Sequence, residues 1–164
     1  MKIELRLLES GDAEAAARWR NDPAVWTHTA ATGRMNVISA DTERAWIEQV
    51  MRNPAERRCA ILADGRHIGN VYLTDILDGT AQFHIFIGDR GMWGRGVGRR
   101  ATAQMLKLGW RELGLRNIHL SVHRENAAAL SLYRGLGFTE EGQVQGETFV
   151  RMVAANPDNT DTGG

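Results

Sequence analysis

The sequence predicts an α/β (α+β) protein in which helices cover both faces of one mixed β-sheet. Short runs that alternate apolar and polar residues indicate strands, and longer stretches with apolar residues three or four positions apart indicate helices. These elements follow in the order β-α-α-β-β-β-loop-α-β-α-β. The first half contains hairpins, which pair antiparallel, and the second contains strand–helix–strand crossovers, which favour parallel pairing.

The first half of the chain is expected to begin with a strand and two helices. A period of two over residues 2–7 predicts the strand. Ser10 is expected to cap a helix over 13–19, and Ser39 a second helix further on. Residues 24–38 show no clear period and predict a loop or an irregular helix.

Three strands should follow in two hairpins. Strands over 58–63 and 68–76 flank Asp64-Gly65, and a strand over 80–88 follows Asp78-Gly79. The dipeptide Asp-Gly between alternating runs is a strong hairpin signal, because both residues tolerate a positive φ.

The second half is expected to contain two helices and two strands. A glycine-rich loop opens a long helix that ends near residue 113. A strand over 118–122, a short helix over 126–134 closed by Gly135, and a strand over 148–154 complete the pattern.

Length and composition indicate a single domain. The chain has 164 residues, of which 43% are hydrophobic and 24% are charged, as in ordinary globular proteins. We expect residues 1–155 to form this domain and residues 156–164, which have nothing apolar to bury beyond a proline, to be disordered.

Charge and hydropathy exclude several classes of function. Basic and acidic residues balance at 20 each, which argues against a nucleic-acid-binding protein. No apolar run is long enough to span a membrane and no signal peptide is evident, so a cytoplasmic protein is expected. The single cysteine, Cys59, excludes an intramolecular disulfide and a metal site built of several cysteines.

The glycine-rich loop is the sharpest functional signal. Its sequence is Gly94-Arg95-Gly96-Val97-Gly98-Arg99-Arg100, directly after a strand and at the start of a helix. Glycine lets the backbone approach a ligand, and a helix N-terminus suits phosphate. The dinucleotide fingerprint would need glycine in place of Arg99, and the nucleotide P-loop would need Lys and Ser/Thr after its last glycine. A flexible turn before a helix is the alternative.

A second signal lies in the short helix. Tyr133 follows Asn126 by seven residues, about two helical turns, so the two side chains share a helix face. Asn126 could cap the helix or bind a ligand amide. Tyr133 could donate its phenolic proton in a cleft or be a buried aromatic residue.

Together these two stretches resemble the GNAT superfamily of acetyl-CoA-dependent N-acetyltransferases over residues 3–153. Gly96 and Gly98 match the two small positions of the family's pyrophosphate loop, while Trp93 stands where Gln or Arg is usual. This variant, and Arg18-Trp19-Arg20-Asn21-Asp22-Pro23, resemble the branch that includes ribosomal-protein N-terminal acetyltransferases and nucleotide-amino-sugar N-acetyltransferases. The family pattern Asn-x6-Tyr-x3-Gly-Phe is matched by Asn126, Tyr133, Gly137 and Phe138.

The resemblance implies a centrally splayed sheet that admits acetyl-CoA between strands 80–88 and 118–122, and no metal. It implies direct transfer of the acetyl group to a primary amine. A backbone N–H near Phe86 or Ile87 would bind the thioester carbonyl, and Tyr133 would protonate the leaving thiolate. The groups expected to hold the co-substrate are Phe86, Ile87, Trp93, Gly94, Arg95, Gly96, Val97, Gly98, Arg99, Asn126 and Tyr133.

The base that takes the amine's proton is less clearly indicated. Related enzymes often use a Glu early in the strand over 80–88, where this chain has Gln82, which cannot accept a proton. His84 lies on the same strand face, and an ordinary histidine pKa of about 6.5 suits a base. A buried, hydrogen-bonded histidine is the alternative, and His123, the pair Glu140-Glu141 and a water chain remain open.

Acceptor-binding residues are expected in the variable segments, and the candidates are Trp26, Arg34, Tyr72, Thr74 and Gln82. An aromatic residue with arginine suits a sugar nucleotide, and an acid such as Asp75 suits a cationic amine or a peptide N-terminus. We expect a small-molecule amine, such as a nucleotide-linked amino sugar or an aminoglycoside. A protein N-terminus as acceptor and a non-catalytic acyl-CoA-binding sensor are the alternatives. A homodimer is compatible with the family, and no nucleic-acid or membrane partner is expected.

Overall fold

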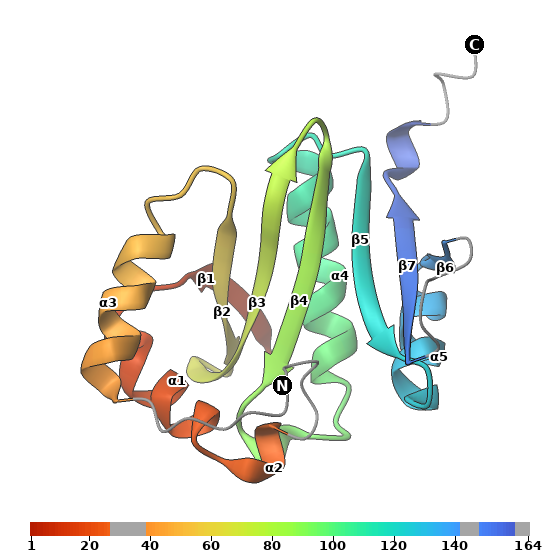
Figure 1. The fold of residues 1–164 in the computed structure, drawn as a ribbon. Helices are drawn as coiled ribbons and strands as arrows, with labels where there is room; N and C mark the ends of the chain where they lie inside the picture. The colour runs from red at the N-terminus through yellow and green to blue at the C-terminus, as the bar shows by residue number, and fades with distance from the viewer. Residues whose placement is uncertain (27–38, 142–147, 160–164) are drawn as a thin grey trace.

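A computed structural model describes residues 1–26, 39–141 and 148–159 (Figure 1). Its seven strands form one sheet in the order β1-β2-β3-β4-β5-β7-β6. The strands are β1 (Ile3–Leu7), β2 (Arg57–Ala63), β3 (Arg66–Leu77), β4 (Thr80–Ile87), β5 (Asn117–His123), β6 (Thr139–Glu140) and β7 (Phe149–Ala155). The α-helices are α1 (Ala13–Arg20), α2 (Pro23–Trp26), α3 (Ala40–Val50), α4 (Val97–Arg111) and α5 (Ala127–Gly135).

The first four strands are adjacent and antiparallel, and β2, β3 and β4 are joined by the two hairpins that the sequence predicts. The two Asp-Gly turns join β2 to β3 and β3 to β4, and all four of their residues have positive φ. Two-residue hairpin turns require this conformation because its twist matches that of the flanking strands. Both predicted hairpins are therefore confirmed.

The helix starts are only partly as expected. The Ser39 side chain accepts a hydrogen bond from the Thr42 N–H, which confirms it as the cap of α3. Ser10, in contrast, lies inside a short 3-10 helix before α1, where Glu9 and Asp12 form a reciprocal capping box. The predicted Ser10 cap is wrong, because the chain turns one residue earlier. Within the described ranges no helix is both long and apolar enough to cross a membrane.

In the second half of the sheet, one of the two expected parallel pairings is found and the other is not. β4 and β5 pair in parallel, as expected for strands joined through α4. β5 and β7 pair antiparallel, which contradicts the expectation of a second parallel crossover. After α5 the chain forms the short strand β6, which pairs antiparallel with β7 at the edge of the sheet. This additional reversal sets the direction in which β7 runs.

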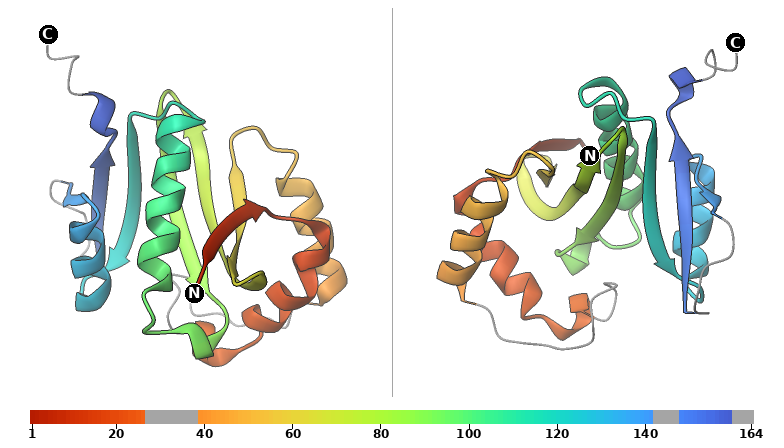
Figure 2. Two further views of the ribbon diagram at one scale, coloured as in Figure 1. Left: turned by 180° about the vertical axis from the view of Figure 1, so that it is seen from behind. Right: turned by 45° about the horizontal axis from the view of Figure 1, so that its top comes forward.

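The parallel pair β4–β5 is short and then opens. Thr80, Ala81 and Gln82 are in register with Asn117, Ile118 and His119, and no pairing continues beyond them. Figures 1 and 2 show the two strands close together at this end and apart at the other. The sheet is thus splayed at its centre, between the two strands for which the sequence predicts it.

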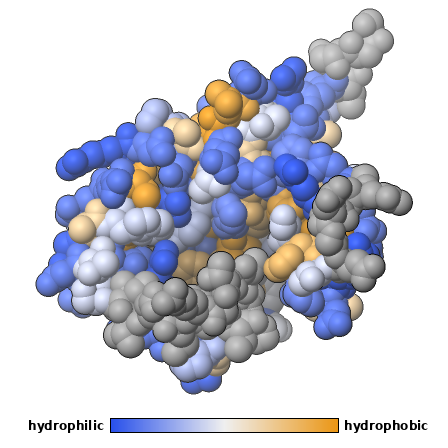
Figure 3. Space-filling model, in the orientation of Figure 1, coloured by the Kyte–Doolittle hydropathy of each residue, from blue (hydrophilic) through white to orange (hydrophobic). Residues whose placement is uncertain are grey.

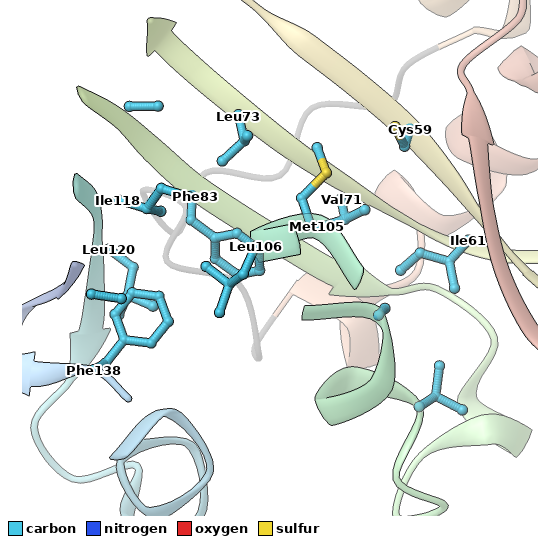
Figure 4. Packing of buried hydrophobic residues seen from close by; sticks show 14 of the residues in the cluster. Cys59, Ile61, Val71, Leu73, Phe83, Met105, Leu106, Ile118, Leu120 and Phe138 are labelled. Atoms are coloured by element: carbon cyan, nitrogen blue, oxygen red, sulfur yellow. The ribbon is translucent and has the colours of Figure 1, made fainter. Parts of the chain in front are cut away.

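Helices pack on both faces of the sheet. α4 and α5 lie on one face, and the main core fills the space between them and the strands (Figures 2 and 4). α1 and α3 lie on the other face, where Ala13 and Ile47 pack against Ala60 of β2. α1 and α3 sit over the β1–β3 side, so none of the described helices covers the same face of β4, β5 and β7 (Figure 1).

The end of the described chain is attached to the domain. Asn156 is buried, and its side-chain amide donates to the Leu115 carbonyl oxygen at 2.8 Å. The Asn159 side chain donates to the Arg116 carbonyl oxygen at 2.8 Å. Residues 156–159 are therefore ordered against the loop before β5, contrary to the disorder expected for them. Residues 160–164 of the expected tail lie outside the described residues.

Candidate active site

The glycine-rich loop connects β4 to α4 and leaves backbone N–H groups at the helix start. Gly94 and Gly96 have φ of 74° and 78°, a left-handed conformation that favours glycine. Gly96 is the N-terminal cap of α4 and provides no side-chain cap, so the first amides of the helix keep their capacity to bind a ligand. Val97 turns its side chain into the core, which leaves its backbone facing the loop.

Open space lies in front of these glycines. A Cβ atom added at Gly94, Gly96 or Gly98 would meet no other atom within 4 Å. Gly98 also has an ordinary helical backbone, so neither packing nor conformation explains glycine at this position. Room for a ligand at the N-terminus of α4 does explain it, since phosphate binds at this place through backbone amides.

Arginine side chains surround the loop. Arg95 is exposed and lies against the sulfur of Met92, whereas Arg100 is held by the Met1 carbonyl oxygen at 2.8 Å. The Arg99 guanidinium reaches α5, because a Cβ at Gly135 would lie 3.2 Å from its Nη1 atom. Arg99 therefore bridges the start of α4 and the end of α5, and it adds positive charge between them.

Trp93 fastens the loop to β4. Its indole Nε1–H donates to the carbonyl oxygen of Ile87 at 2.8 Å. Trp93 occupies the position where the resembled family usually has Gln or Arg. In this chain its polar atom contacts the end of β4, and the loop is thereby fixed relative to the splayed edge.

The free edge of β4 carries backbone groups directed toward β5. Gly88 N–H donates to the Ile68 carbonyl oxygen of β3 at 2.9 Å. Backbone groups of successive residues in a strand point to opposite edges, so Ile87 N–H points away from β3 and Phe86 N–H toward it. Of the two oxyanion donors expected from the sequence, Ile87 is therefore the better placed.

Tyr133 of α5 packs against β4 on the face of the sheet that α5 covers. Its ring contacts Phe83 of β4 and Phe138 edge-on, at centroid distances of 6.2 and 5.6 Å. Burial raises the pKa of Tyr133 to about 12, so the hydroxyl stays protonated at neutral pH. None of the described residues hydrogen-bonds to this hydroxyl, which leaves it free to donate to a ligand.

Asn126 is the N-cap of α5. Its side-chain oxygen accepts from the Ala129 N–H at 3.0 Å, and the residue is exposed. The capping alternative is thus realised, and the side-chain NH2 group remains for a ligand. Gly135 is the last residue of α5, and Gly137, with φ of 101°, takes the left-handed position expected for Gly135.

The opposite face of the sheet gathers the candidates for acceptor binding. Tyr72 and Thr74 of β3 are in register with His84 and Gln82 of β4, so the four side chains lie on one face. The Thr74 hydroxyl and His84 Nε2 are 3.0 Å apart, and the Arg58 guanidinium stacks on the Tyr72 ring at 4.3 Å. Figure 3 views this face, where hydrophobic residues show among hydrophilic ones near the centre.

His84 is kept neutral by its surroundings. Partial burial of the ring and the charge of Arg58 lower the pKa of His84, against opposite contributions from Asp75 and Glu56. Asp75 lies in a β-bulge with φ of 52°. With regular pairing Asp75 would point to the far face, but the bulge leaves its carboxylate near His84.

The remaining base candidates differ in their surroundings. His123 Nδ1 accepts from the Glu125 N–H, and its ring packs on Phe149. Glu140 pairs with Arg134 at 3.1 Å. Glu141 contacts His119 Nδ1 at 3.0 Å, which links one sequence candidate to a histidine that sequence analysis missed. The sequence signal that could have identified His119 as a site candidate is its place as a polar residue between the apolar residues of its strand.

Of the remaining predicted site residues Phe86, Trp26 and Arg34, the structure describes the side chain of Phe86 alone. The Phe86 side chain packs against Trp19 and Tyr72 under α1, away from the loop. Trp26 is the last residue of α2. Arg34 lies outside the described residues.

Comparisons with known proteins agree with this geometry. A family model described as an acetyltransferase (GNAT) domain matches residues 2–139. Spermidine N(1)-acetyltransferase of Escherichia coli K12 is 33% identical over 102 residues, which cover 61% of this chain and 54% of that protein. The chain thus spans about half the length of this relative. Its counterpart in Vibrio cholerae is 29% identical over 152 residues, which cover 91% of this chain and 86% of that protein.

A solved structure extends the similarity to three dimensions. The crystal structure of Vibrio cholerae spermidine N-acetyltransferase in complex with CoA and spermine has a TM-score of 0.82 and 27% identity, covering 94% of this chain and 95% of that chain. The sheet splayed at β4–β5, the glycine loop and the family model over most of the sequence lead to the same conclusion: this chain belongs to the GNAT acetyltransferase domain family.

Proposed function

We propose that the protein transfers an acetyl group from acetyl-CoA directly to a small primary amine. The observation that carries this proposal is the convergence of three features on the gap between β4 and β5. The strands part after Gln82 and His119, the loop at Gly96 opens at one end of the gap, and Tyr133 approaches it from α5. Each feature fits a different portion of acetyl-CoA.

The pyrophosphate of acetyl-CoA would bind at the start of α4. The backbone N–H groups of Val97, Gly98 and Arg99 are the first amides of this helix, and the helix dipole adds partial positive charge. Arg99 would contact the phosphates from the side of α5. The pantetheine arm would then run along the unpaired edge of β4 and hydrogen-bond to backbone groups that β5 does not reach.

The acetyl transfer itself would use two donors. Ile87 N–H would stabilise the charge that develops on the thioester oxygen, an effect worth about 10²–10³ in kcat for oxyanion donors in other enzymes. Tyr133 would donate its proton to the leaving sulfur. The hydroxyl suits this role because it is protonated at neutral pH and because no described residue competes for it.

The acceptor amine would approach from the face without helices. It would meet Thr74, Gln82 and His84 there, on the side of the sheet opposite Tyr133. His84 offers the amine a neutral imidazole there, because its lowered pKa keeps the ring uncharged at pH 7.

A cationic amine fits this face best, and a polyamine is the first acceptor to test. Asp75 lies beside His84 and forms no ion pair with any described residue, so its carboxylate is available to an ammonium group. The two relatives named above act on spermidine, which favours the same class. An aminoglycoside is also a cationic amine, whereas a nucleotide-linked amino sugar would bring negative charge toward Asp75.

The test is CoA thiol release from acetyl-CoA with a panel of amines and an amine-free blank. The panel contains spermidine, an aminoglycoside, a 4-amino sugar nucleotide and a short peptide with a free N-terminus. We expect release with spermidine, and Asp75→Asn should raise the KM for spermidine about tenfold. A matched control is Asp78→Asn in the hairpin turn before β4, which should leave that KM unchanged.

Two outcomes would overturn parts of the proposal. Release with the peptide or the sugar nucleotide alone would replace the proposed acceptor class and keep the transferase activity. Bound acetyl-CoA without release for any amine would favour the acyl-CoA-binding sensor.

A further inference from the structure

We propose that the base acting on the acceptor amine is His119, oriented by Glu141, and not His84. The inference rests on the proposed acetyl transfer and assigns a residue that neither the family motifs nor the comparisons indicate. It is carried by a histidine–carboxylate pair that lies on the acceptor face, at the point where β4 and β5 separate.

The pair has the geometry of an oriented base. His119 Nδ1 lies 3.0 Å from Glu141 Oε2, and the His119 side chain is only 14% exposed. A carboxylate at Nδ1 holds the proton on that nitrogen, which leaves the lone pair of Nε2 free to accept a proton. Glu141 is fixed in turn by Arg151, whose Nε lies 3.3 Å from the same carboxylate oxygen, and by its backbone N–H bond to the Arg151 carbonyl oxygen.

His119 lies on the acceptor face at the closed end of the gap, five residues along β4 from Ile87, or about 16 Å, so the amine's proton would reach it through water in the gap. His119 is in register with Gln82 of β4, in the last pair before the strands part. Partners in adjacent strands lie about 4.8 Å apart and turn their side chains to the same face. Gln82 occupies the position where related enzymes often carry a Glu that acts as the general base. His119 lies next to that position on the neighbouring strand.

His84 is less suited to the same task. Its Nε2 already contacts the Thr74 hydroxyl at 3.0 Å, and no carboxylate hydrogen-bonds to its ring among the described residues. His84 would therefore bind or face the acceptor, while the proton would pass to His119. The charged groups that face His119 are Glu141 directly and Arg151 through Glu141, and its neighbours in register on β4 and β7 are the uncharged Gln82 and Val153.

The proton balance of the transfer is simple. The amine nitrogen forms a bond to the acetyl carbon and loses one proton, which passes through water in the gap to His119 Nε2, while the carbon–sulfur bond breaks. The sulfur takes a proton from the Tyr133 hydroxyl and leaves as CoA thiol. Water then removes the proton from His119 and returns one to Tyr133, so no further reactant is needed.

The experiment compares four single variants, His119→Gln, Glu141→Gln, His84→Gln and His123→Gln, with the wild type in pH profiles of kcat and KM for the acceptor. His119→Gln should lower kcat about 10²-fold and remove the decline of the rate at acidic pH. Glu141→Gln should lower kcat about tenfold and leave KM for acetyl-CoA unchanged, since it acts by positioning His119. His123→Gln tests the other histidine on the same strand and face, whose Nδ1 accepts from the chain itself. Wild-type kinetics of this variant would support His119 as the base, and loss of the decline at acidic pH in this variant alone would overturn the assignment.

Acetyl-CoA affinity and thermal unfolding of each variant show whether it is folded. Should His119→Gln fail to fold, His119→Asn and the recovery of His119→Ala by added imidazole take its place, because imidazole restores a missing base and not a missing packing contact. Recovery supports the assignment. Full activity of folded His119→Gln would overturn the assignment of His119 while leaving the acetyl transfer intact. Loss of the decline in rate at acidic pH in His84→Gln alone would do the same. A wild type that binds acetyl-CoA and releases no thiol with any amine would overturn both.

Discussion

Strand β4 pairs with β3 from Thr80 to Ile87 but with β5 only from Thr80 to Gln82. On the β3 side the strands approach so closely that Gly69 has no room for a Cβ, which would collide with the Phe86 carbonyl group. On the β5 side no described strand pairs with the backbone groups of the second half of β4. One edge of the strand thus holds the domain together, and the other is available to a substrate.

This contrast separates residues that maintain the fold from residues that perform the chemistry. Variants at the β3–β4 contact should lower stability. Variants around the β4–β5 gap should change kinetics and leave stability nearly unaffected. The four predictions below test this separation from the largest expected effect to the smallest.

Tyr133→Phe should lower kcat about 10²-fold, because general acids contribute about 10²–10⁴ in rate. The thermal unfolding temperature should change little, since no described residue hydrogen-bonds to the lost hydroxyl. With a pKa of about 12 the hydroxyl is protonated throughout the working range, so the ratio of wild-type to variant kcat should be constant between pH 6 and 9. A ratio that varies tenfold with pH would contradict this role.

Gly69→Ala should destabilise the fold by about 1–3 kcal/mol, the usual effect of overpacking a close contact. Denaturant unfolding measures this loss. Gly11→Ala is the matched control, because a Cβ at Gly11 would meet nothing within 4 Å and its φ is not positive. Equal stability of the two variants would show that the close approach of β3 and β4 is not needed.

Gly98→Ala should act in opposite directions on stability and on binding. Alanine is a better helix former than glycine, by up to about 1 kcal/mol, and the added Cβ meets no atom of the protein. The same methyl group would enter the space proposed for the pyrophosphate. We expect calorimetry to show about tenfold weaker binding of acetyl-CoA, equal to about 1.4 kcal/mol, together with unchanged or higher stability. Unchanged affinity for acetyl-CoA would show that the pyrophosphate does not bind in the space next to Gly98.

Trp93→Phe should have the smallest effect. An aromatic ring remains at this position, and the hydrogen bond from the indole to the Ile87 carbonyl oxygen is lost. Such a bond contributes about 0.5–1.5 kcal/mol. Because Ile87 also carries the proposed oxyanion donor, we expect kcat to fall several-fold with a smaller change in KM for acetyl-CoA. An effect on KM alone would mean that Trp93 contacts the ligand and does not position β4.

Local signals were sufficient for much of the fold. The two Asp-Gly turns and the Ser39 cap act within a few residues, and the structure confirms them. The direction of β7 was wrong because it depends on β6, a strand of two residues that has no period of its own. The bulge at Asp75 likewise follows from how β3 meets β4, and an alternating pattern cannot encode it.

The candidate site shows the same division. The glycine loop and Tyr133 could be proposed from the sequence because the glycines, the helix start and the seven-residue spacing are close together in the chain. His119 and Glu141 are separated by 22 residues, and only the register of β5 with its neighbours brings them together. Trp93 was expected to contact the ligand, but its partner Ile87 belongs to the preceding strand, and only the structure identifies that contact.

An unpaired strand edge inside a sheet is a template on which foreign strands can pair, and this is a common route to aggregation. The second half of β4 offers such an edge to any strand that reaches it before the substrate does. A ligand that binds only the folded protein protects it by mass action, by about 2.7 kcal/mol at one hundred times its dissociation constant. If acetyl-CoA binds as proposed, it should protect this chain from such pairing, and the amount of folded protein in a cell should follow the supply of acetyl-CoA.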